Sequence, residues 1–180
     1  MNKIPYKQYC WSLGTTSFRT KNFNKTIEQQ LMLLYDFWNL PENKNKYWEG
    51  NNKLQSEYYD FMHKNDFITG EAANKPKDAR EKTSGLVDIG LIDEQRRVTE
   101  AGLALLSISK IGNFETDNFL QIDKDSFLYL KQLLKTSNNI NGEIVRPFII
   151  LLYLLSKFDE LSLDEYAYLL PLCTSADYTE

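Results

Sequence analysis

The side chains best suited to bind another molecule lie between residues 77 and 97. Arg80, Thr83 and Ser84 are three and four residues apart, so they share one face of a helix predicted from Pro76 to Val87. Guanidinium and hydroxyl groups donate hydrogen bonds to phosphates and base edges, so we predict that this face contacts DNA. The predicted contacts in this stretch are Lys77, Arg80, Lys82, Thr83, Ser84, Arg96 and Arg97, the last two reaching the DNA backbone.

The elements around this face are predicted to be a helix, a tight hairpin and a second helix. Gly90 permits the backbone reversal at the end of the first helix, and Asp93–Arg96 forms a polar tip before a return strand that begins at Val98. Thr99 is the predicted N-cap of a helix from Glu100 to Ser107. This order is typical of the second half of a winged helix-turn-helix, which commonly presents a helix to the major groove. A winged helix that makes only protein contacts is the alternative.

A second group of candidate contacts lies near the N-terminus. Small hydroxyl side chains on a flexible backbone suit phosphate or base contacts, and a guanidinium adds a further donor. The predicted contacts that follow Gly14 are Thr15, Thr16, Ser17 and Arg19. An ordinary loop anchored to the core by Trp11 and Phe18 explains the same residues equally well.

Helical periodicity dominates the rest of the chain. Ser162 and Glu165 have the spacing of a capping box, and Leu170, Leu169 and Tyr166 are predicted to face inward after it. A loop is predicted over Ser137–Gly142. The other predicted helices cover residues 26–39, 53–65, 125–136 and 147–158.

We therefore predict a mainly α fold in two parts. Residues 1–110 form a winged helix-turn-helix recognition subdomain with an N-terminal arm. Residues 111–180 form a helical second subdomain that begins an incomplete second helix-turn-helix. Because a third, DNA-facing helix would follow the last predicted pair, we expect this subdomain to be truncated at its C-terminus.

The charge distribution favours an anionic partner for the first half of the chain. The net charge of the 180 residues is −4, which argues against a uniformly basic nucleic-acid binder. Residues 1–82 carry 13 Lys and Arg against 10 Asp and Glu, whereas residues 83–180 carry 8 against 15. A phosphate-facing surface is therefore expected on the first half.

Several other classes of protein do not fit the sequence. The longest apolar run, 147–155, is about half of what a membrane span needs, and residues 1–5 lack a signal-peptide core, so we expect a cytoplasmic protein without a membrane partner. Two cysteines and one histidine, His63, are too few for a disulfide framework or a zinc site. The nearest carboxylate pattern, Asp36 with Glu42 and Lys44, falls on a helix end and a polar loop, so we expect no cofactor in this chain.

Several segments resemble the AlwI-type family of type IIS restriction endonucleases, in the family's order. They are Tyr9–Arg19 with Lys25–Leu31, Gly90–Gly102, and Phe127–Leu134 with Pro147–Leu170. The run Trp-Ser-Leu-Gly-Thr-Thr-Ser-Phe-Arg in the first segment is the most specific of these motifs.

This resemblance implies the recognition part of a two-part type II site-specific deoxyribonuclease. In the family an N-terminal region reads a short asymmetric site in double-stranded DNA, and a separate C-terminal nuclease domain cuts outside it with Mg²⁺. The chain resembles only the first part, so we expect the catalytic domain to be missing and a cognate methyltransferase to act in the same system. A winged-helix transcription regulator or adaptor remains the alternative, and the acidic second half favours it slightly. An intact small nuclease would need a carboxylate cluster that the sequence lacks.

Overall fold

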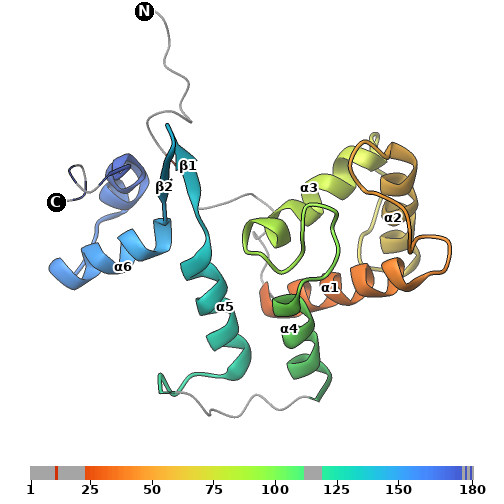
Figure 1. Cartoon of the computed structure of the whole chain (residues 1–180), viewed down its shortest axis with the longest axis horizontal. Coiled ribbons are helices and arrows are strands. Elements are labelled where there is room, and N and C mark those ends of the chain that lie inside the picture. The colour runs from red at the N-terminus through yellow and green to blue at the C-terminus, as the bar shows by residue number, and fades with distance from the viewer. Residues whose placement is uncertain (1–10, 12–22, 112–118, 176, 178, 180) are drawn as a thin grey trace, which may run out of the picture. The chain divides into compact units, whose positions relative to one another are not determined.

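The computed structural model describes residues 11, 23–111, 119–175, 177 and 179, and these residues are mainly helical, as predicted (Figure 1). The chain divides into two compact units. The N-terminal unit comprises residues 15–132. The C-terminal unit comprises residues 133–180 and residues 1–14, of which Trp11 is described.

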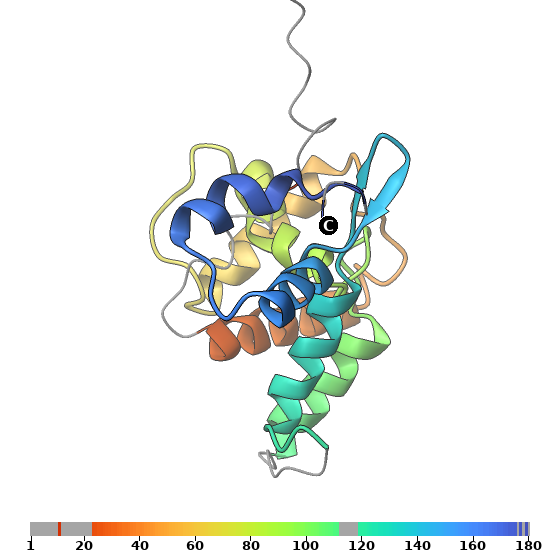
Figure 2. The same cartoon turned by 90° about the vertical axis from the view of Figure 1, so that its left-hand side faces the viewer.

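The N-terminal unit is built from five helices along its described residues: α1 (Phe23–Asn39), α2 (Asn52–Lys64), α3 (Lys75–Asp88), α4 (Glu100–Ile111) and α5 (Lys124–Lys135), whose last turn passes into the C-terminal unit. Helix α2 lies against α3, and α1 packs on both α2 and α4 (Figures 1 and 2). The largest fully buried side chains of this unit come from α1, α2, α3, α4 and the turn after α3: Leu31, Leu34, Phe37, Leu54, Gln55, Tyr58, Met62, Leu86, Leu91, Ile92 and Leu105.

Two asparagines fix where α2 and α3 begin. The side-chain oxygen of Asn51 accepts a hydrogen bond from the Leu54 N–H, and that of Asn74 accepts one from the Lys77 N–H. Each satisfies an amide that the first helical turn leaves without a partner. Both helices match their predicted ranges within one residue at each end, whereas α1 begins three residues before the predicted Thr26.

Gly90 ends α3 in the predicted way. Its φ is +70°, a left-handed conformation that glycine adopts without strain. The Gly90 N–H bonds the Val87 carbonyl at 2.8 Å, and the Leu91 N–H bonds the Leu86 carbonyl at 2.9 Å. These two bonds form a Schellman motif, which turns the chain back over the end of the helix.

The predicted hairpin is a tight turn with almost no strand. The Arg96 and Asp93 amides bond the carbonyls of Asp93 and Arg97, each at 2.9 Å, and a single antiparallel bridge joins Ile92 to Val98. The return strand predicted from Val98 is wrong, because α4 begins only two residues later. Thr99 does cap α4 as predicted: its hydroxyl oxygen accepts a hydrogen bond from the Gly102 N–H at 3.3 Å.

The C-terminal unit contains a true hairpin at a place predicted as a loop. Strands β1 (Asn138–Ile140) and β2 (Glu143–Val145) pair antiparallel, with Asn138 opposite Val145. Asn141 and Gly142 form the tip with φ of +53° and +92°. An Asn-Gly pair with both φ values positive is the usual two-residue hairpin turn, so the loop prediction missed an available signal.

Helical segments complete this unit: α6 (Pro147–Lys157), the π-helix η3 (Glu165–Leu169) and the 3-10 helix η4 (Leu170–Leu172). The predicted capping box is present, since Glu165 accepts from both the N–H and the hydroxyl of Ser162, at 2.8 and 2.7 Å. Leu170 is buried as predicted, but Tyr166 and Leu169 are 40 and 59 % exposed. The wider π-helical turn changes which side chains share a face, so the inward face predicted from α-helical spacing was wrong for these two.

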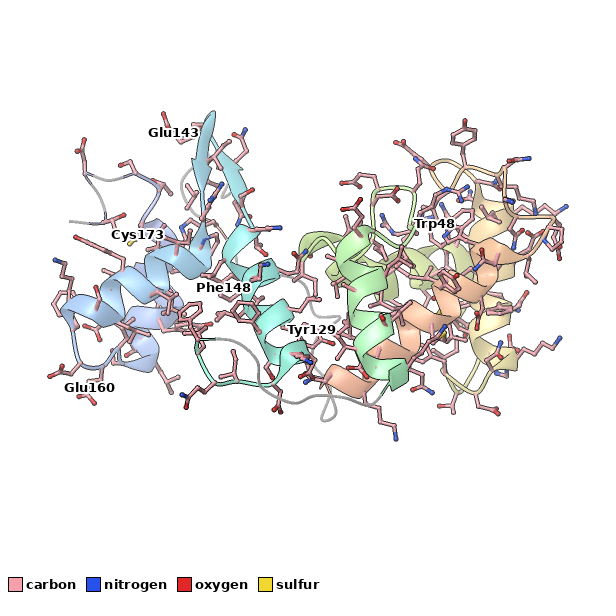
Figure 3. All side chains as sticks on the ribbon, turned by 60° about the horizontal axis from the view of Figure 1, so that its bottom comes forward. Trp48, Tyr129, Glu143, Phe148, Glu160 and Cys173 are labelled. Atoms are coloured by element: carbon pink, nitrogen blue, oxygen red, sulfur yellow. The ribbon has the colours of Figure 1, made fainter. Side chains whose placement is uncertain are left out.

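Trp11 anchors the core of the C-terminal unit. Its backbone N–H donates to the Pro171 carbonyl at 3.1 Å, and its indole N–H donates to the Cys173 carbonyl at 3.0 Å. Its buried ring packs with Ile140, Val145 and Leu170. Figure 3 shows Glu143 at the hairpin and Cys173 near α6 in the same unit.

The division between the units falls later than predicted. The predicted boundary follows residue 110, whereas the observed one follows residue 132. The reason is that α5 is tied to the N-terminal unit. Asn24 donates to the buried Asp125 carboxylate at 3.1 Å, and Gln132 donates to the Ile89 carbonyl at 2.8 Å.

Candidate nucleic-acid interface

Seven of the predicted contact residues lie on α3 and on the turn at residues 93–97, within the N-terminal unit. The other four, Thr15, Thr16, Ser17 and Arg19, lie outside the described residues. Arg80, Thr83 and Ser84 do not form the single open face that their spacing suggested, because Thr83 is buried.

Lys77 and Lys82 lie at the surface of α3 and pair with carboxylates of the same helix. The Lys77 ammonium is 3.5 Å from Glu81, and the Lys82 ammonium is 3.7 Å from Asp78. Ser84 donates to the Glu81 carbonyl one turn earlier. Exposed pairs of this kind contribute little stability, so a phosphate can replace the carboxylate at low cost.

Thr83 is not available for the DNA contact predicted for it. Its side chain is fully buried, on the same side of α3 as the buried Ala79 and Leu86. The hydroxyl donates back to the Ala79 carbonyl at 2.8 Å and accepts from the Nε of Arg96 at 2.9 Å. The Thr83 hydroxyl therefore fixes the position of the Arg96 side chain.

Arg96 is fixed at several points. Its backbone φ is +62°, an uncommon conformation for a non-glycine residue, which the turn imposes. Besides the bond to Thr83, its Nη1 donates to the Glu94 carbonyl at 3.1 Å, and its guanidinium lies 5.8 Å from the centre of the buried Trp48 ring. Burial lowers the pKa of Arg96, and the positive charge of Arg80 lowers it further, while nearby carboxylates oppose this, Glu94 most strongly.

Arg97 is used to hold the turn in place. Its guanidinium lies 4.2 Å from the centre of the Trp38 ring. Its Nη2 donates to the carbonyls of Lys44 and Lys46, at 3.0 and 3.1 Å. These contacts fasten the turn to the loop between α1 and α2, which leaves Arg97 less able to reach the DNA backbone than predicted.

Arg80 is held by neutral side chains. Its Nη1 donates to the side-chain oxygen of Gln55, and more weakly to that of Asn52 at 3.4 Å. Gln55 is buried and in turn donates to the Trp48 carbonyl at 2.8 Å. No carboxylate of the described residues lies within ion-pair distance of Arg80.

Arg80 and Arg96 converge on one cavity of about 630 Å³, which we call the arginine cavity. Its volume is within the usual range for small-molecule sites. It is lined by Trp48, Glu49, Gly50, Asn52, Gln55, Arg80, Glu94 and Arg96.

The residues that the sequence analysis missed are those that α2 contributes to this cavity. Asn52 and Gln55 are spaced i and i+3, so they share a helical face, which is a signal that could have been used. The contribution of Trp48 depends on the loop between α1 and α2 folding back, and no local pattern indicates that.

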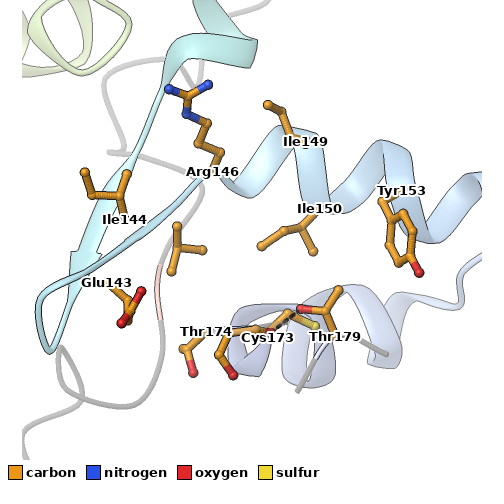
Figure 4. Close-up of a pocket in the computed structure, with 11 residues that line it drawn as sticks. Glu143, Ile144, Arg146, Ile149, Ile150, Tyr153, Cys173, Thr174 and Thr179 are labelled. Atoms are coloured by element: carbon orange, nitrogen blue, oxygen red, sulfur yellow. Dashed lines mark hydrogen bonds between the residues drawn. The ribbon is translucent and has the colours of Figure 1, made fainter. Parts of the chain in front are cut away.

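A second cavity, of about 450 Å³, lies in the C-terminal unit beside β2 and α6 (Figure 4). Ile144, Ile149 and Ile150 give it a mainly apolar lining. Burial raises the pKa of the Cys173 thiol on its wall, against the effect of a hydrogen bond with Thr179. It contains none of the predicted contact residues.

Neither a metal cluster nor a membrane span is found in the described part of the chain. No three His, Cys, Asp or Glu side chains gather there in a way that could hold a metal ion. Of the helices described, none combines the length and the apolar character needed to cross a membrane.

Comparison of the chain with protein-family models, with curated proteins and with solved structures found no match.

Proposed function

We propose that this chain binds double-stranded DNA sequence-specifically through α3, the turn at residues 93–97 and the arginine cavity. The observation that carries the proposal is the convergence of Arg80 and Arg96 on one cavity with Asn52 and Gln55. Arginine and the side-chain amides are the groups that most often read guanine and adenine edges. The N-terminal candidates Thr15, Thr16, Ser17 and Arg19 are proposed as further DNA contacts on the basis of their residue types.

In this proposal α2 and α3 form a helix-turn-helix, and the turn at residues 93–97 takes the place of the wing. The resemblance to the AlwI-type family extends the proposal to a larger protein. The chain would be the recognition part of a type IIS restriction endonuclease, with a separate Mg²⁺-dependent nuclease domain and a cognate methyltransferase in the same system.

One observation favours a regulator or adaptor that binds protein instead. All three lysines on α3 are already paired: Lys75 lies 2.8 Å from Asp60, and Lys77 and Lys82 pair along the helix. Together with a net charge of −4, this pairing leaves a weaker positive field than most DNA-binding surfaces have.

Selection from a pool of randomised DNA duplexes distinguishes the two functions. The 180-residue chain is expected to enrich a short asymmetric motif, which is read out by sequencing the bound fraction. Absence of enrichment even at low salt would contradict specific DNA binding by this chain.

A pair of charge reversals tests the surface. Arg80→Glu is expected to weaken binding to the enriched duplex far more than Lys131→Glu. Lys131 lies exposed on α5, outside the proposed surface, and the two variants have the same net charge. Equal losses would mean that the proposed surface is not the one that contacts DNA.

A further inference from the structure

The two arginines of the arginine cavity are anchored in the same way, each by one buried neutral side chain. Gln55, 2 % exposed, accepts from Arg80, and Thr83, 0 % exposed, accepts from the Nε of Arg96. A carboxylate in either position would cancel the charge of the arginine that it holds. A neutral acceptor fixes the guanidinium and leaves its positive charge available to a ligand.

Each guanidinium keeps donors for a ligand. An arginine has five N–H groups. The Nη2 of Arg96 and the Nε and Nη2 of Arg80 make no hydrogen bond within the described part of the chain. The nearest carboxylate to Arg96 is Glu94 at 3.9 Å, and the Glu94 side chain is 88 % exposed, so this pair is weak.

Two close guanidinium groups repel each other, and the partial burial of Arg96 makes this repulsion harder for water to screen. Burial is the main cause of the lowered pKa of Arg96, and the positive charge of Arg80 adds to it. A ligand that accepts hydrogen bonds from both arginines would relieve the repulsion. This makes the cavity complementary to an acceptor-rich group before any ligand arrives.

We infer that the arginine cavity binds one group with two hydrogen-bond acceptors side by side, and that Gln55 and Thr83 are its positioning residues. A backbone phosphate and the O6/N7 edge of guanine both have this geometry. That the group belongs to nucleic acid rests on the proposed function, whereas the acceptor chemistry of the cavity does not.

The test observes the arginine Nε–H signals by NMR while the full chain is titrated with inorganic phosphate, and separately with uncharged guanosine. Saturable shifts of both the Arg80 and Arg96 signals are expected with at least one probe. Shifts with phosphate alone indicate a phosphate site, and shifts with guanosine alone indicate a base-reading site. No saturable shift with either probe would overturn the inference.

Substitutions at Thr83 test its positioning role. Thr83→Val keeps the shape of the side chain but removes the acceptor of Arg96. It is expected to weaken probe binding about 5- to 10-fold, which is the effect of losing one hydrogen bond. Thr83→Ser restores the hydroxyl and should restore binding. Ser56→Ala removes a hydroxyl that bonds a helix carbonyl on α2 and should change nothing. Equal binding by wild type and Thr83→Val would overturn the role of Thr83, and so would failure of Thr83→Ser to restore binding.

Arg96→Lys tests the acceptor geometry without depending on Thr83. Lysine keeps the charge but cannot present two parallel donors, so binding of the effective probe should fall sharply. Undiminished binding by this variant would overturn the two-acceptor site. The outcome is separate from that of the DNA selection: a probe that binds without any DNA enrichment leaves the site in place and removes the proposed function. If the chain binds DNA and both Arg96→Lys and Thr83→Val leave that binding unchanged, the proposed function stands and the two-acceptor site is overturned.

Discussion

At the scale of single residues, the adjacent tyrosines Tyr58 and Tyr59 on α2 are both buried but differ in whether their hydroxyls are hydrogen-bonded. Both side chains are buried. The Tyr59 hydroxyl donates to the Gly70 carbonyl at 3.0 Å and accepts from the Ala72 N–H at 2.8 Å. The Tyr58 hydroxyl has no partner among the described residues, and burial raises its pKa far above the ordinary range.

Opposite effects on stability are therefore expected from removing these two hydroxyls. Tyr58→Phe removes a buried polar group that is not satisfied, so it should leave the free energy of unfolding unchanged or raise it by about 1 kcal/mol. Tyr59→Phe should lower it by about 1–2 kcal/mol, because a carbonyl and an amide lose their partner. Urea unfolding of the two variants measures the difference. Equal losses would mean that the Tyr58 hydroxyl is hydrogen-bonded in solution.

Differences in burial also explain how much of the candidate site could be predicted from the sequence. Arg80 was identified from residue type and helical spacing, and Arg96 from residue type and its place on the predicted hairpin; both line one cavity. Thr83 is three residues after Arg80 and was predicted on the same helical face, yet it is buried and accepts a hydrogen bond from Arg96. Spacing tells which side chains share a face of α3, but whether another segment covers part of that face depends on packing between segments distant in sequence.

At the scale of secondary-structure elements, the end of α3 depends on the left-handed conformation of Gly90. Gly90→Ala is expected to lower the free energy of unfolding by about 1 kcal/mol, because a side chain is strained at φ of +70° and its Cβ would lie 3.1 Å from the Gln132 side chain. Gly90→Asn should cost less strain, since asparagine tolerates this conformation better. Thermal unfolding measures both variants. An alanine variant as stable as wild type would show that the turn has another conformation.

The capping box at Ser162 and Glu165 gives the C-terminal unit a dependence on pH. Hydrogen bonds from the Ser162 hydroxyl and N–H lower the pKa of Glu165. A carboxyl whose pKa is lower in the folded state stabilises the fold above its unfolded pKa, and this stabilisation is lost as the pH falls through the folded value. Ser162→Ala should therefore reduce protection of the amides in 163–170 against hydrogen exchange at neutral pH.

The effect of Ser162→Ala on exchange should shrink as the solution is acidified through the pKa of Glu165. Glu165→Gln is the matched control, because it cannot ionise and should remove this part of the pH dependence. A difference between wild type and Ser162→Ala that is the same at every pH would contradict a role for the Glu165 charge.

Helix positions were largely predictable from the sequence, because apolar spacing and capping residues are local signals. Asn51, Asn74 and Thr99 cap helices at or near their predicted starts. The strands were not predicted correctly. The Asn141-Gly142 pair was a local signal for a hairpin that was overlooked, whereas the missing strand at Val98 follows from how early α4 begins, which the apolar pattern alone does not determine.

At the scale of the whole molecule, the charge limits how the proposed DNA binding would work. The net charge is −4, and Lys77 and Lys82 each have to exchange a paired carboxylate for a phosphate before they can neutralise it. Binding to duplex DNA becomes weaker with salt by about 0.9 log unit per log unit of salt for each phosphate neutralised. We therefore expect a shallow salt dependence, with specificity coming more from the arginine cavity than from a broad positive surface.

Substitution of single lysines checks this expectation. Lys77→Gln on the exposed side of α3 should reduce the slope of log affinity against log salt by about 1, and Lys82→Gln should do the same. Lys131→Gln, which removes one positive charge from α5, should leave the slope unchanged. The slopes are measured by fluorescence anisotropy on the enriched duplex. A wild-type slope near the value of about −10 known for strongly basic contacts would mean that DNA lies against a surface other than α3, because α3 and its neighbouring turn do not have enough cations to produce it.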